Sequence, residues 1–181
     1  MQQFISYYDQ FLNILTKLAA VIAGLFILAT AFIILYEVIM RSIFHAPTEW
    51  VLEISTYFII MAGFLGLAIT FREQAHVHVD ILTNRFNTEN RRKLRLILNV
   101  LSFLLFLIFM TESMDLVIAS YTYNKLSPSI LRFPLFIPQL ALVLGSALLL
   151  GEIARQFFFD LWRLNPADKA YHTKERKVSG L

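Results

Sequence analysis

The chain of 181 residues has no cysteine and little charge, and both absences narrow what it can do. Without thiols it cannot form disulfides or thiolate metal centres, and it cannot use a cysteine nucleophile. Only 16% of its residues are charged and 57% are hydrophobic. An average soluble domain is about 25% charged and about 45–50% apolar. The composition therefore indicates a membrane protein.

Four long runs have no charged residue, and each approaches the length of a membrane span. About 20 apolar residues cross the hydrocarbon core as a helix. The uncharged runs are 18–36, 54–71, 96–111 and 133–151. The first is too long for the core of a signal peptide and no clear cleavage site follows it, so we expect it to be retained. We predict an all-α membrane protein whose four-helix domain, residues 18–165, has spans at about 18–40, 50–71, 96–121 and 133–155.

Lysine and arginine are distributed unequally between the connections, and this asymmetry predicts the orientation. If both termini are inside, the inner segments hold 13 of these residues and the two outer loops hold three. Cytoplasmic loops of membrane proteins carry the excess of Lys and Arg. We therefore expect both termini, the loop 72–95 and the polar tail 166–181 to be cytoplasmic.

Segments outside the spans have the pattern of amphipathic helices that lie on the membrane surface. In residues 1–17, apolar side chains share one helical face and polar side chains share the opposite one. The residues that end the fourth span repeat this spacing, with Phe157 and Leu161 on one face. In the loop 72–95, the stretch NTENRRKLR is typical of a helix start with a basic cluster suited to anionic lipid. Such helices either anchor the chain or brace a larger membrane partner.

The motif HVHVD places His76, His78 and Asp80 close together after the second span. Three ligands at this spacing share one face only if the segment is extended. On a helix, successive members diverge by about 200°. We therefore favour a hydrogen-bonded junction between the second helix and the loop, with a metal site as the weaker alternative. None of the four histidines falls inside a span, which excludes paired haem ligation between helices.

Charged residues also gather at the outer ends of the first two spans. Glu37 and Arg41 are four residues apart with the acid first, the favourable order for a pair within a helix. Glu53 begins the second helix on the same side, shortly after Pro47 and Trp50. We favour a capping and interhelical ion cluster here, ahead of a contact with a partner protein and of a substrate-binding role.

The helix centres have no ionisable residue, and this absence limits the function. Glu112 and Asp115 fall toward the outer end of the third helix, and Glu152 and Arg155 form a potential pair at the inner end of the fourth. A transporter normally builds its site from broken helices and polar groups near the midplane. The sequence offers neither, nor a nucleophile–base pair or a phosphate-binding loop. We predict that the chain is not an enzyme and does not carry a polar solute alone.

Residues from 41 to 138 include a set with a characteristic order and spacing: Arg41, Phe44, Pro47, Trp50, Glu53, Gly63, Gly66, His76-Val77 and Val79-Asp80, followed by RFPLFIP at Arg132–Pro138. In this order and spacing the chain resembles the small membrane subunit, or Q subunit, of tripartite ATP-independent periplasmic (TRAP) transporters, above all over residues 41–80. The length, the four spans and the inside termini fit this family over nearly the whole chain. One departure is Leu52-Glu53, where many members have paired acids.

The resemblance implies a non-catalytic scaffold subunit in the bacterial inner membrane. In such systems a large membrane subunit carries the substrate, usually an organic acid, by a sodium-driven elevator motion, and a soluble periplasmic protein captures it. The expected partners are these two proteins and membrane lipids, with no nucleic acid and no cofactor in this chain. The residues expected to form partner contacts or structural junctions are Glu37, Arg41, Pro47, Trp50, Glu53, His76, Asp80, Arg132 and Pro134.

Two other functions remain compatible with the residues themselves. One is a small transporter or channel that acts alone, which would move a solute across liposomes without a partner. The other is the membrane anchor subunit of a redox enzyme, which would show a bound metal or a haem absorbance band.

Overall fold

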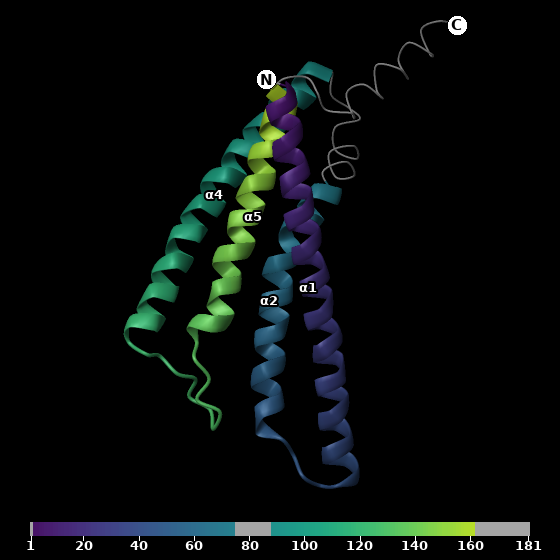
Figure 1. The fold of residues 1–181 in the computed structure, drawn as a ribbon, viewed down its shortest axis with the longest axis vertical. Coiled ribbons are helices and arrows are strands. Elements are labelled where there is room, and N and C mark those ends of the chain that lie inside the picture. Colours follow the sequence, from purple (N-terminus) through teal and green to yellow (C-terminus); the bar gives the residue numbers. More distant parts are fainter. Residues whose placement is uncertain (1, 75–87, 162–181) are drawn as a thin grey trace, which may run out of the picture.

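The computed structural model describes residues 2–74 and 88–161, and within them it contains four α-helices and no strand (Figure 1). The helices are α1 (Gln2–Ile43), α2 (Glu49–Gln74), α4 (Thr88–Thr122) and α5 (Phe136–Leu161). Each contains a stretch that is long and apolar enough to cross a membrane. For residues 2–74 and 88–161, the prediction of an all-helical protein with four such helices is therefore confirmed.

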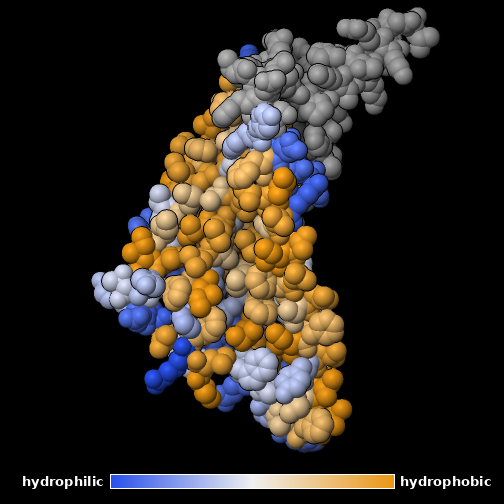
Figure 2. Space-filling view, viewed as in Figure 1, coloured by the Kyte–Doolittle hydropathy of each residue, from blue (hydrophilic) through white to orange (hydrophobic). Residues whose placement is uncertain are grey.

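The helices form two hairpins that lie side by side in a single layer. α1 packs on α2, α4 packs on α5, and the two hairpins meet where α2 contacts α5 (Figure 1). We call the end where α1 begins and α5 ends the terminal end, and the end with the loops 44–48 and 123–135 the hairpin end. Near the terminal end α1 also contacts α5. Because the layer is one helix thick, much of its apolar surface faces outward, as Figure 2 shows for one face.

The α2–α5 contact depends on small residues. The buried face of α5 includes Ala141 and Gly145, and two small residues four apart permit close helix packing. A Cβ atom added at Gly145 would overlap the backbone carbonyl of Phe64 on α2. On the other side of α2, a cluster of Ala19, Ala23, Ala62 and Leu65 joins it to α1. The backbones can approach closely because these side chains occupy little volume.

The N-terminal segment differs from the expectation of a separate interfacial helix over 1–17. α1 runs without a break to Ile43, which makes it 42 residues or about 63 Å long. Its first turns pack on protein, because Leu12 and Thr16 are buried and the Tyr8 hydroxyl donates to the Gly151 carbonyl at 3.2 Å. The apolar stripe of this segment is therefore used at least partly for contact with α5.

The starts of α4 and α5 differ from the expected loop 72–95 and from the expected span at about 133–155. α4 begins at Thr88, so the basic stretch after it continues directly into the third span and is not a separate helix within a loop 72–95. Pro134 precedes α5 and pairs with Leu126 in an isolated bridge, whereas Pro138 occupies the first helical turn. Proline is tolerated there because the first N–H groups of a helix have no intrahelical partner.

At the hairpin end, several residues adopt the left-handed backbone conformation, with a positive φ. α4 ends in a Schellman motif, in which Asn124 has a φ of 47° and the Lys125 N–H donates to the Ser120 carbonyl at 2.9 Å. His45, with a φ of 53°, follows α1 in the same region of conformational space. Residues 125–135 then fold back as a narrow loop, closed by the Ser127 N–H donating to the Phe133 carbonyl at 2.9 Å.

Candidate functional site

Four charged side chains converge near the terminal end and join three helices. Arg72 on α2 contacts Glu152 through Nη1 and Oε1 at 2.8 Å, and Asp9 on α1 through Nη2 and Oδ1 at 2.6 Å. Arg155 contacts the same two acids, Glu152 at 2.6 Å and Asp9 at 3.4 Å. We call these four residues the four-charge cluster. It links α1, α2 and α5 in a closed ring of two cations and two anions.

The four-charge cluster is arranged to hold helices and leaves little capacity for a ligand. The Glu152 side chain is 0% exposed, and each of its two oxygens accepts from a different arginine. Removing one partner of a buried pair is strongly destabilising because it leaves an uncompensated charge. The charges balance, and because each arginine contacts both acids, the cluster ties α1 and α2 to α5.

Sequence reasoning found only one edge of this cluster. The expected pair of Glu152 and Arg155 is present. Asp9, however, belongs to the polar face of residues 1–17, which we expected on the membrane surface, and Arg72 to the expected loop 72–95. A usable signal was available. Arg72 and Glu152 directly follow apolar runs and Arg155 comes three residues later, while Asp9 precedes the first run by nine residues. All four charges lie on the side of the membrane that was predicted to be inside, and charges on one side are candidates for mutual contact.

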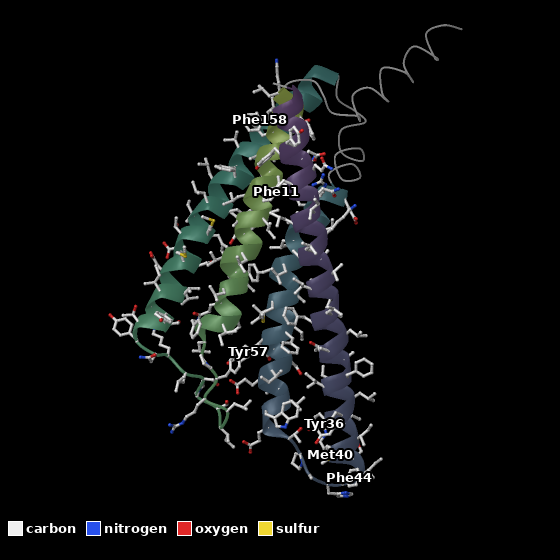
Figure 3. All side chains as sticks on the ribbon, in the orientation of Figure 1. Phe11, Tyr36, Met40, Phe44, Tyr57 and Phe158 are labelled. Carbon is white, nitrogen blue, oxygen red and sulfur yellow. The ribbon has the colours of Figure 1, made fainter. Side chains whose placement is uncertain are left out.

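A second polar cluster lies at the hairpin end around Glu53, close to the start of α2. Its carboxylate accepts from the Tyr57 hydroxyl at 2.8 Å and from the Ser129 hydroxyl. Tyr57 lies on the side of α2 that faces the α4–α5 connection, and its ring is 5.4 Å from that of Phe133 (Figure 3). We call Glu53, Tyr57 and Ser129 the Glu53 cluster. It attaches α2 to the second hairpin through neutral hydroxyl donors, where an ion cluster was expected.

Glu37 stabilises the first hairpin loop. Its carboxylate accepts from the Thr48 N–H at 3.0 Å and from the Thr48 hydroxyl, directly before α2 begins. Among the ion pairs within residues 2–74 and 88–161, none joins Glu37 to Arg41. A negative charge at the N-terminus of a helix is favoured by the helix dipole, and this competes with the expected pair. Glu37 therefore joins α1 to the residue that directly precedes α2.

The two hairpin loops together line an open cavity of about 440 Å³. Pro47 and Trp50 contribute from the first loop and the start of α2, and Ile130 contributes from the second loop. Trp50 also packs on Tyr36 of α1, with ring centroids 6.1 Å apart. Of the residues selected from the sequence, Pro47 and Trp50 thus share this surface. It is made of residues from both hairpin loops and from the first turn of α2.

The other selected residues lie elsewhere. Arg41 is exposed on the last turn of α1, and Arg132 is exposed in the second loop with a φ of 46°. His76 and Asp80, with His78, lie outside the described residues. Within the described ranges, no group of three or more His, Asp or Glu residues could hold a metal ion.

These features define a multi-pass helical membrane protein whose polar contacts lie near the ends of its helices. Residues 30–163 match the family model described as tripartite ATP-independent periplasmic transporters, DctQ component. The chain belongs to this family, the small permease subunits of TRAP transporters, and the match covers most of the four-helix layer. The family is a component of transporters and not a family of enzymes.

A curated relative connects this family to a larger permease. The chain is similar to the sialic acid TRAP transporter permease protein SiaT of Haemophilus influenzae (strain 86-028NP), with 27% identity over 95 residues. The aligned segment covers 52% of this chain and 15% of that relative. The chain therefore spans only a small part of the length of the curated relative that it matches.

Proposed function

We propose that this chain is the non-catalytic scaffold subunit of a bacterial uptake system for an organic acid. In this role it holds the stationary part of a large, sodium-coupled membrane subunit that carries the substrate by an elevator motion. It also helps to dock a periplasmic substrate-binding protein. In this role the chain itself binds no cofactor. Sodium coupling belongs to the large subunit.

The observation that carries this proposal is the outward-facing surface of the helix layer. Large apolar side chains are exposed on all four helices, while the strongest polar contacts, the four-charge cluster and the Glu53 cluster, are used up in joining the helices to each other. A layer one helix thick has two faces to cover, and packing against another membrane protein covers one of them. The large relative supports the same role, since there the matching segment is a small part of a permease chain.

The predicted topology assigns each end a task. With both termini in the cytoplasm of an inner-membrane protein, the four-charge cluster lies toward the cytoplasm and the hairpin end faces the periplasm. The cavity lined by Pro47, Trp50 and Ile130 would then lie on the side where a periplasmic protein arrives. His76 and Asp80 would form the junction between α2 and the loop that follows it.

Reconstitution tests this proposal directly. The purified chain, the large TRAP subunit of the same organism and its periplasmic protein are placed in proteoliposomes, each omitted in turn, and uptake of organic acids is measured under a sodium gradient. We expect uptake only when all three are present. Uptake by this chain alone would overturn the scaffold role and favour a transporter that acts without partners. Full uptake without this chain would overturn it as well.

A further inference from the structure

Two carboxylates on α4 lie on its outward face, between apolar side chains. Glu112 and Asp115 are both exposed, and Leu116 and Ile118 beyond them are exposed as well. Glu112 lies ten residues, or about 15 Å along the axis, before α4 ends at Thr122. The exposed rings of Tyr121 and Tyr123 lie at that end, and tyrosine favours the membrane interface. Both acids therefore lie within the span of α4, Leu96–Thr122, and deeper in the membrane than the outer end where we expected them.

The two acids continue a regular stripe along α4. Leu101, Leu105 and Ile108 are exposed by 61%, 58% and 64%, and they precede Glu112 and Asp115 at alternating steps of four and three residues. This spacing produces the seam along which one helix packs on another. The opposite side of α4 faces α5 and buries Ser113 and Val117. The stripe is thus a separate surface, unused by the described part of the chain.

The carboxylates indicate which occupant the stripe requires. A charged side chain inside a membrane helix is costly, and it usually faces protein or water and pairs with an opposite charge. Within residues 2–74 and 88–161, no ion pair reaches Glu112 or Asp115. Lipid chains would cover the leucines but offer nothing to the acids. A second copy packed in parallel on the same stripe would bring like charges together, which is unfavourable.

We propose that this stripe is the contact surface for a transmembrane helix of the large subunit, and that Glu112 and Asp115 pair there with a Lys or Arg side chain. The inference rests on the proposed scaffold role and specifies the surface and the charge through which it acts. The apolar residues supply the seam, and the two acids fix its register. Without the two carboxylates, the Lys or Arg side chain of the large subunit would lose its ion pair and would lie unpaired within the membrane.

The test uses the complex of this chain with the large subunit, co-expressed and purified in mild detergent through a tag on the large subunit. Glu112→Gln and Asp115→Asn, alone and together, are compared with Glu73→Gln, which removes an exposed carboxylate near the end of α2. We expect the double variant to bind the large subunit at least about tenfold more weakly. Glu73→Gln should bind as the unchanged chain does. The melting temperature of each variant without the large subunit shows that its own fold is intact.

A photo-crosslinking residue at position 108 provides a measurement that does not depend on removing charge. We expect the crosslink to join this chain to the large subunit, and a crosslinker at position 107, which lies off the stripe, to give much less product. Normal binding by the double variant, or crosslinks from position 108 only to lipid or to a second copy, would overturn the inference while the scaffold role stands. If the large subunit fails to bind even the unchanged chain, the scaffold role fails and the inference fails with it.

Discussion

Arg72 and Glu152 are separated by eighty residues in the sequence, yet their side chains meet at 2.8 Å. The contact joins the end of α2 to α5 at a point where the Glu152 carboxylate is completely buried. Glu152 also contacts Arg155, and Arg72 also contacts Asp9, so α5 is joined at this location to both helices of the first hairpin. The stability of the layer should therefore be unusually sensitive to this location.

Arg72→Gln should destabilise the purified chain strongly. The substitution leaves a buried carboxylate with one cation, and breaking such a pair costs about 3–5 kcal/mol. Thermal unfolding in detergent measures the effect, with Lys17→Gln, an exposed cation on α1, as the matched control. Equal melting temperatures for the two variants would show that the four-charge cluster contributes little to stability.

Gly145→Ala should separate α2 from α5. The new methyl group would overlap the Phe64 carbonyl, and overpacking of this kind costs about 1–3 kcal/mol. Gly24→Ala is the control, since nothing lies within 4 Å of a Cβ there, and alanine is a better helix former than glycine. The first variant should melt at a lower temperature than the unchanged chain and the second should not. A stable Gly145→Ala variant would contradict the close approach of the two helices.

Glu53→Gln should loosen the loop between α4 and α5. An amide has one acceptor oxygen, so the contacts with the Tyr57 and Ser129 hydroxyls can no longer be shared by two carboxylate oxygens. Hydrogen exchange followed by mass spectrometry should show faster exchange in residues 125–135. Glu49→Gln, an exposed acid at the start of the same helix, should leave exchange there unchanged. Identical exchange in both variants would show that the Glu53 cluster does not link the two hairpins.

The predicted orientation can be tested directly because the chain has no cysteine of its own. Lys125→Cys, in the loop at the hairpin end, should react in intact cells with a maleimide that does not cross the inner membrane. Lys93→Cys, near the start of α4, should react only after the membrane is opened. The opposite pattern would place the termini in the periplasm and would contradict the distribution of lysine and arginine.

The four spans could be predicted from the sequence because hydropathy over about 20 residues is a local property. Apolar runs are visible without knowing what packs beside them, and the helices occur where the runs do. The continuity of α1 was not visible. An amphipathic stripe such as that of the first 17 residues fits a lipid surface and a protein surface equally well, and only its contact with α5 distinguishes them.

The polar sites were predictable only in part, for a physical reason. Spacing within one helix revealed the pair of Glu152 and Arg155, since residues three apart are neighbours on a helix. The contacts of Asp9 with Arg72 and of Glu53 with Ser129 depend on how helices are placed relative to each other. Glu37 illustrates the same limit. Its neighbour on the helix was Arg41, but the fold offered Thr48 from across the loop.

The length of α1 has a consequence for the lipid environment in which the chain can work. A helix tilted by 40°, at the upper end of the usual range, needs only about 26 residues to cross a 30 Å core. α1 has 42 residues, so it has a surplus of several turns whatever its inclination. Hydrophobic mismatch should therefore strain α2 and α5, with 26 residues each, before it strains α1. In a thicker bilayer, more of α1 would lie in the hydrocarbon. The greatest thickness that the chain can span would be set by the two shorter helices, α2 and α5.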